Sequence, residues 1–323
     1  MTAIANTATT LTTKGIHEDL ENTIYRVAPF KTPFQANIGA APKATNTYHE
    51  WQTEGLETPV ATNIQLEGDD VASFDSEDSS VRVGNYCQIF RKTGIVSETD
   101  NVVKKAGRAS EVNRQKVLKG LALRTDMEMT FLANGPSAQQ SGGVGRKCAG
   151  LPAWLTSNVS FGTGGAAGGF SGGTVAAASP GTARSFTEAL LKNVRATAFA
   201  NGATPNQVYV GPTDKQVMSG FTGIAGIRKE VAGDEQATII GGADVYVDDF
   251  GKMTLIPHQY AFNANSPNFA LLVDPNMVGV ATLRGIETVP LAKTGDAEKF
   301  MILAEKTLVV RNEKAHAAIF AIN

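Results

Sequence analysis

Residues 169–173 (GFSGG) match the G-x-S-x-G pattern of a nucleophile elbow, in which a serine attacks an acyl carbon. That chemistry needs a strand before the serine and a helix after it, so that the hydroxyl is presented to its catalytic partners. Here the pattern lies inside residues 160–181, which are built largely from Gly, Ala, Ser and Thr and predict a mobile loop or an insertion. We therefore do not assign Ser171 as a nucleophile.

Other patterns with possible chemistry are equally incomplete. Residues 142–147 (GGVGRK) resemble a phosphate-binding loop but lack its spacing and its closing Lys-Ser/Thr pair. The acids of residues 69–78 lack the spacing and the glycine of an EF-hand. None of the histidines has the spacing of zinc ligands; they are His17, His49, His258 and His316. We expect no catalytic residue, no metal and no cofactor.

The sequence predicts a globular protein without a signal peptide or a membrane-spanning segment. The 323 residues are 42% hydrophobic and 19% charged, enough for a sizeable core. A net charge of −2 argues against a whole-protein field that attracts nucleic acid. Two cysteines fit a reducing compartment. Residues 1–13 lack a signal-peptide pattern and no apolar run is long enough to span a bilayer, so we expect synthesis in the cytoplasm and no membrane partner.

The first half of the chain predicts an arm and a long excursion. Residues 1–45 form the expected arm, and residues 46–93 the excursion, with strands at 47–53 and 81–90. Prolines in the arm keep the residues before them out of the helical region. Phe30, Phe34 and Trp51 are therefore expected to need a partner surface, either on their own subunit or on a neighbour.

The next segment, residues 94–160, contains the strongest helix, at about residues 110–134. Ser110 is the expected N-cap and residues 134–136 (NGP) end the helix, which would be roughly 35 Å long. Its expected core stripe consists of Val117, Leu118, Leu121, Ala122, Met129 and Leu132.

After the glycine-rich segment, taken as residues 161–181, the chain predicts a mixed domain. Residues 182–285 carry a helix capped by Ser185 and several short strands, one of them at residues 237–247. Residues 286–323 return to the earlier domain and end in strands, with β-rich runs at residues 300–303 and 308–310 and then at 315–322. Strands mixed with separate helices, without a βαβ repeat, predict an α+β fold.

The charges are segregated along the sequence. Between Ala44 and Val81 there is no Lys or Arg, whereas the acids are Glu50, Glu54, Glu57, Glu67, Asp69, Asp70, Asp75, Glu77 and Asp78. Residues 102–124 are basic, with Lys104, Lys105, Arg108, Arg114, Lys116, Lys119 and Arg124 against Glu111 alone. A charge run is often only a solvated surface, but these two runs are also candidates for mutual contact.

Several motifs resemble those of one family of tailed-phage major head proteins. They are residues 24–34 (IYRVAPFKTPF) followed by 38–39 (IG), 47–53 (TYHEWQT), 124–128 (RTDME) in a helix ending at 134–135 (NG), 150–155 (GLPAWL) with Asn158, and 312–316 (NEKAH). The order of segments is similar to the Hong Kong 97 fold. The resemblance implies an N-terminal arm, an extended loop, a peripheral domain with a long spine helix, and an axial domain. Residues 160–181 depart from it.

The resemblance implies a capsid subunit that forms hexamers and pentamers of an icosahedral head around double-stranded DNA, in a virion assembled in the bacterial cytoplasm. Its implied partners are other copies of itself, a portal protein, and a decoration protein as a further candidate. Because the arm motif begins about 20 residues from Met1, we expect a separate scaffolding protein. The alternatives are a tail or decoration protein, or a soluble enzyme or ligand-binding protein with a long lid.

The expected contacts between subunits follow from the aromatic and charged residues. We expect Phe30, Phe34 and Trp51 as apolar anchors, with Trp51 alternatively belonging to its own subunit's core. We expect the acidic loop, through Glu67, Asp69 and Asp70, to lie on the basic helix start of a neighbour. Lys104, Lys105, Arg108, Arg114 and Lys116 supply the positive charge; the competing interpretation turns them toward packaged DNA. Some shells of this fold join a loop lysine covalently to a neighbour's asparagine, but this loop has no lysine.

Overall fold

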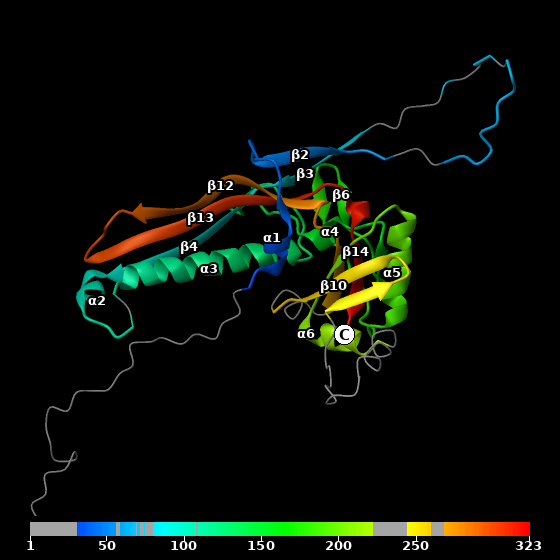
Figure 1. Ribbon diagram of the computed structural model, residues 1–323. Helices are drawn as coiled ribbons and strands as arrows, with labels where there is room; N and C mark the ends of the chain where they lie inside the picture. Colours follow the sequence, from blue (N-terminus) through cyan, green and yellow to red (C-terminus); the bar gives the residue numbers. More distant parts are fainter. Residues whose placement is uncertain are drawn as a thin grey trace, which may run out of the picture.

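A computed structural model describes two β-sheets lying side by side, a long helix under the first and a ribbon above it (Figure 1). The described residues are 31–55, 59–68, 70–71, 74, 80–107, 109–221, 244–259 and 268–323. Helices occur together with sheets whose strand pairs are mostly antiparallel, so the predicted α+β class is confirmed.

The first sheet has four strands in the order β1-β12-β13-β4. Their bounds are Gly39–Ala40 for β1, Val278–Leu291 for β12, Ala297–Val310 for β13 and Gln88–Ser97 for β4. β12 and β13 form a long antiparallel hairpin, and β4 pairs along most of β13. The result is an elongated sheet that extends well away from the second sheet (Figure 1).

The predicted long helix is α3, Glu111–Leu132, and the Ser110 side chain caps it by accepting the Asn113 N–H. A short helix, α2 (Glu98–Val102), precedes it. α3 lies along β4 and β13 (Figure 1).

The predicted core stripe of α3 needs correction. The buried apolar residues are Val112, Leu123, Met127, Phe131 and Leu132, whereas Val117 is exposed and Leu118, Leu121, Ala122 and Met129 are only half-buried. Phe131 meets Phe90 of β4 edge-on, with ring centroids 6.2 Å apart.

The second sheet has six strands in the order β5-β14-β11-β8-β10-β9. Their bounds are Val159–Ser160, Ala317–Ile322, Asn268–Val273, Gln207–Val210, Gly251–Pro257 and Val245–Asp248. Helices α5 (Glu188–Ala200) and α6 (Pro212–Ser219) accompany it, and a short 3-10 helix η1 (Glu313–Ala315) leads into β14.

Three neighbouring strands of the second sheet, β14, β11 and β8, are buried on both faces, and β11 shows why such a strand is continuously apolar. Phe269, Leu271 and Val273 belong to the core shared with α3, whereas Ala270 and Leu272 belong to the core under α5. Because successive side chains point to opposite faces, a strand between two cores needs apolar residues at every position.

Above the first sheet, β2 (Tyr48–Thr53) and β3 (Val81–Tyr86) pair as an antiparallel ribbon, as predicted, and the described residues of the loop joining them lie beyond the body (Figure 1). The predicted return strand does not run to residue 90: it ends at Tyr86, and β4 starts at Gln88 in the first sheet.

The glycine-rich segment contains its own hairpin, β6 (Gly169–Ser171) and β7 (Thr174–Ala176), packed beside α4 (Leu151–Trp154). Main-chain hydrogen bonds, for example between Ala166 and Ser179, also join its two halves, so the segment predicted as a mobile loop or an insertion contains regular structure.

Other boundaries also differ from those predicted. Thr187, not Ser185, caps α5. β12 begins at Val278, ahead of the predicted boundary at residue 286, and the two predicted runs near the C-terminus form one continuous strand, β13. β14 completes the second sheet instead of the first. Of the strand predicted at residues 237–247, positions 237–243 lie outside the described residues.

Candidate assembly surfaces

The arm residue Phe34 lies in the core of its own subunit. It belongs to helix α1 (Pro33–Asn37), is 0% exposed, and meets the Tyr209 ring edge-on at 5.5 Å. Its predicted role as an anchor on a neighbouring subunit is therefore corrected, since a side chain without exposed surface cannot reach another copy. Phe30 lies outside the described residues.

Glu128 of α3 holds the arm in place, a role that sequence reasoning missed. Its carboxylate accepts the backbone N–H groups of Phe34, at 2.7 Å, and Gln35, at 3.0 Å. It also lies 3.2 Å from Nε2 of His258, and both side chains are fully buried. Two N–H groups at the first turn of α1 and an imidazole thus surround one charge. The available signal was an acid flanked by residues of the buried helix face, Leu123, Met127 and Phe131.

Trp51 of β2 makes its contacts within the subunit. Its indole Nε1–H donates to the carbonyl of Val310 at 2.9 Å, and its ring lies 5.4 Å from that of Trp154. The ring is half-buried and packs against the core. These contacts favour the alternative in which Trp51 belongs to its own subunit.

The loop between β2 and β3 presents both acids and large apolar groups. Of the predicted acids, Glu67 and Asp70 are exposed, and Asp69 lies outside the described residues. Ile64 is 82%, Leu66 79% and Phe74 89% exposed. Large apolar side chains gathered on one projecting segment are typical of a surface that is covered by a partner.

The basic residues before and along α3 are only partly available to a partner. Lys105 pairs with Asp100 at 2.7 Å, Arg114 with Glu111 at 3.2 Å, and Lys116 with Glu298 at 3.5 Å. The Lys116 ammonium also lies 5.5 Å from the centre of the Phe300 ring. Lys104 is exposed, and Arg108 lies outside the described residues. Intrachain pairing thus neutralises part of the positive charge that the sequence suggested.

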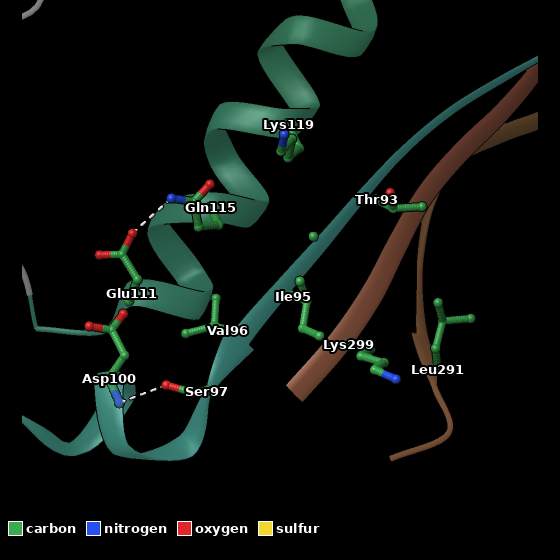
Figure 2. A pocket seen from close by; sticks show the side chains of 11 residues that line it. Thr93, Ile95, Val96, Ser97, Asp100, Glu111, Gln115, Lys119, Leu291 and Lys299 are labelled. Atoms are coloured by element: carbon green, nitrogen blue, oxygen red, sulfur yellow. Dashed lines mark hydrogen bonds between the residues drawn. The ribbon is translucent and has the colours of Figure 1, made fainter. Parts of the chain in front are cut away.

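A groove of about 600 Å³ opens between the start of α3 and the far end of the four-stranded sheet (Figure 2). Ile95 of β4 and Leu291 of β12 line it, and they are 63% and 39% exposed. Lys119 of α3 and Lys299 of β13 add positive charge at the same groove, and Asp100 and Glu111 add negative charge near α2 (Figure 2). The groove therefore combines exposed apolar side chains with two lysines.

Two of the sequence motifs meet in space. The Asn158 amide donates to the carbonyls of Lys314, at 2.6 Å, and His316, at 3.0 Å. Glu313 accepts the backbone N–H groups of Thr156 and Ser157. The segment after α4 and the segment before β14 are thus locked together by polar contacts, which gives these motif residues a role in the fold.

The serine pattern at residues 169–173 lacks the geometry of a nucleophile elbow. Ser171 lies in β6 beside a two-residue turn, without the helix that an elbow needs. Across the described ranges, no three His, Cys, Asp or Glu side chains gather as metal ligands. Nor is any helix in that part of the chain long and apolar enough to cross a membrane.

Comparison with known proteins agrees with this arrangement. Residues 3–323 match the family model of the SU10 major capsid protein. The major capsid protein of Escherichia phage Phieco32 is 24% identical over 330 residues, covering 93% of this chain and 92% of that protein.

Solved phage capsids share the fold. The cyanophage A-1(L) capsid subunit superposes with a TM-score of 0.60 at 10% identity, covering 98% of this chain and 99% of that one. A structure of the major capsid and decoration proteins of Phage G gives a TM-score of 0.55 at 10% identity, with 100% of both chains covered. The chain belongs to the SU10 major capsid protein family and is a structural subunit of a phage capsid with the Hong Kong 97-like fold.

Proposed function

We propose that this subunit forms the hexamers and pentamers of an icosahedral head that encloses double-stranded DNA. The observation that carries the proposal is the projecting loop, whose Ile64, Leu66 and Phe74 remain more than three-quarters exposed at 82%, 79% and 89%. Covering one such side chain contributes roughly 1.5–3 kcal/mol, so a repeated lattice contact at this loop is a strong driving force.

The two sheets supply the two domains of the proposed lattice unit. The four-stranded sheet with α3 is the peripheral domain, and the six-stranded sheet with α5 and α6 is the axial domain. The β2–β3 ribbon is the base of the extended loop. Most of the described apolar core belongs to the two sheets and their helices, so the loop is the segment most in need of a neighbour.

The loop's partner is the groove beside α3 on a second copy. Its Ile95 and Leu291 match the loop's apolar residues, and its Lys119 and Lys299 match the acids Glu67 and Asp70 in charge. These two lysines replace the basic residues that the sequence predicted for this contact, because Lys105 and Arg114 already have acidic partners in their own subunit. Single exposed ion pairs contribute about 0–1 kcal/mol, but many copies act together in a closed shell.

The remaining partners are proposed from the similarity to phage capsid proteins. A separate scaffolding protein and a portal protein would guide assembly in the host cytoplasm, and a decoration protein is supported by the Phage G structure, which contains one. In the competing arrangement the basic residues, among them the exposed Lys104, face packaged DNA.

Charge reversal separates the two arrangements. The variant Glu67→Lys/Asp70→Lys should fail to form shells, and a second reversal at Lys119→Glu/Lys299→Glu should partly restore them. Asp249→Lys, an exposed acid at the turn between β9 and β10, is the matched control and should assemble normally. Normal empty shells from the loop variant would rule out the loop contact and favour the DNA-facing arrangement. Electron microscopy and sedimentation provide the readout.

A further inference from the structure

We propose that the glycine-rich hairpin β6–β7 holds the base of the β2–β3 ribbon and so sets the direction in which the extended loop leaves the subunit. Tyr48 and Phe170 are the positioning residues. The inference adds a role for residues 160–181, and its use in assembly rests on the proposed contact between the loop and a neighbour.

The glycines of the hairpin fit the backbone conformation of its turn and the close approach of its two strands. Gly172 and Gly173 form its two-residue turn with φ of 58° and 86°, a conformation that favours glycine and suits a tight antiparallel hairpin. Near its base, a Cβ added at Gly168 would lie 2.1 Å from the carbonyl oxygen of Ala176. The glycines thus allow a close approach of two backbones and need not indicate mobility.

The returning strand of the hairpin is anchored to the segment after α3. Asn134 exchanges two hydrogen bonds with the backbone of Ala178, at 2.6 and 2.9 Å. Ser137 does the same with Val175: the Val175 N–H donates to Ser137 Oγ at 2.7 Å, and the Ser137 N–H donates to the Val175 carbonyl at 2.9 Å. The Val175 side chain is 1% exposed. The hairpin is therefore fastened to the body independently of the ribbon.

The turn of the hairpin is hydrogen-bonded to the first strand of the ribbon, β2. The Tyr48 hydroxyl donates to the carbonyl of Gly173 at 2.9 Å. Gly84 of β3 leaves room for this ring, because a Cβ there would lie 2.7 Å from Tyr48 Cζ. The Tyr48 ring is thus seated over β3 with its hydroxyl aimed at the tip.

An aromatic row forms a second contact. The Phe170 ring stacks on Trp154, with centroids 5.8 Å apart and planes 2° from parallel, and Trp154 lies 5.4 Å from Trp51 of the ribbon. Phe170 is half-buried. The row connects the hairpin to β2 through α4.

These contacts matter because a two-stranded ribbon is marginally stable by itself. The β3 side is already held by Asn85, whose amide donates to the carbonyls of Leu308, at 2.9 Å, and Ala149, at 3.2 Å. The β2 side is held by Trp51 and by the hairpin through Tyr48. With both sides fixed, a small rotation at the ribbon base is prevented, and the distant loop keeps its direction.

Distance measurements on the purified, unassembled full-length subunit test the inference. Spin labels at Gln52→Cys in β2 and Val117→Cys in α3 report the ribbon's orientation by pulsed electron paramagnetic resonance; both sites are exposed, whereas the native Cys87 and Cys148 are buried. Tyr48→Phe removes only the hydroxyl, and Phe170→Ala removes the stacked ring. Tyr86→Phe is the matched control, since no hydrogen bond from its hydroxyl is present among the described residues.

Both test variants should broaden or shift the distance distribution relative to the parent and to Tyr86→Phe, with Phe170→Ala giving the larger effect. An unchanged distribution in both variants, with thermal unfolding confirming that they fold, would overturn the inference. The measurement is independent of assembly. If the ribbon is displaced and shells still form normally, the hairpin's role stands and the loop contact proposed above is wrong.

Discussion

The carboxylate of Glu128 on α3 and the imidazole of His258 after β10 form a fully buried pair, with Oε1 and Nε2 3.2 Å apart. Because Glu128 also accepts the N–H groups of Phe34 and Gln35, the arm, the long helix and the six-stranded sheet meet at one residue.

Replacing Glu128 should therefore destabilise the subunit strongly. Glu128→Ala removes the acceptor of two backbone N–H groups and the buried contact with His258, and breaking a buried pair in this way costs roughly 3–5 kcal/mol. Asp126→Ala is the control on the same helix, since its ion pair with Lys92 at 2.5 Å is partly exposed and contributes about 0–1 kcal/mol. Urea unfolding measures both, and similar small losses in the two variants would contradict the central position of Glu128.

His316 predicts an acid limit of stability. Its Nδ1 accepts the Asp274 N–H, its Nε2 lies 3.3 Å from the Met277 carbonyl, and burial lowers its pKa to about 4. The unfolded chain, with a pKa near 6.5, binds a proton first as the pH falls. Stability is thus present above pH 6.5 and lost toward pH 4, by about 3 kcal/mol in all.

Thermal unfolding of the subunit between pH 7 and pH 4 checks the role of His316. In the variant His316→Asn, which cannot titrate, the stability should depend less steeply on pH over this range. An equally steep slope in that variant would assign the acid limit to other groups.

Asp214 in the first turn of α6 is a candidate for stabilisation. It is 0% exposed, neither carboxylate oxygen has a hydrogen-bond partner among the described residues, and burial raises its pKa. A raised pKa favours the folded state at low pH, and this contribution is lost as the pH rises through the folded-state pKa. Asp214→Asn should therefore raise the melting temperature at pH 7, while the exposed Asp249→Asn should leave it unchanged. A lower melting temperature for Asp214→Asn would show that the charge has a role.

Mature particles should contain no covalent link from the extended loop. Between Ala44 and Val81 the chain has no lysine to join to a neighbour's asparagine. Boiled particles in denaturing gels should give a single monomer band. A ladder of higher bands would refute a shell held by non-covalent contacts alone.

The sequence predicted the elements whose signals are local. α3 has an N-cap at Ser110 and a stop after Leu132, and residues 47–53, which contain β2, alternate in the manner of a strand. β12 was missed because Gly279, Gly285 and Pro290 interrupt it and its pairing with β13 shifts register twice. The composition of β12 alone does not predict a strand, and its hydrogen bonds with β13 hold it in the sheet.

Contacts between distant segments were the least predictable part of the candidate surfaces. Phe34 looks exposed in a proline-rich arm, and only the fold brings Glu128 and Tyr209 to it from 94 and more residues away. In the glycine-rich hairpin, order comes from Asn134 and Ser137, outside the segment itself. Composition alone therefore suggested mobility there.

Electron microscopy of the purified full-length protein after assembly, with and without the proposed scaffolding protein, tests the central claim most directly. The account predicts closed shells whose reconstruction shows six-fold and five-fold clusters of this chain, with each β2–β3 loop lying on the groove beside α3 of a neighbouring copy. Discrete small particles under all assembly conditions, or shells in which the loop contacts only its own subunit, would contradict it.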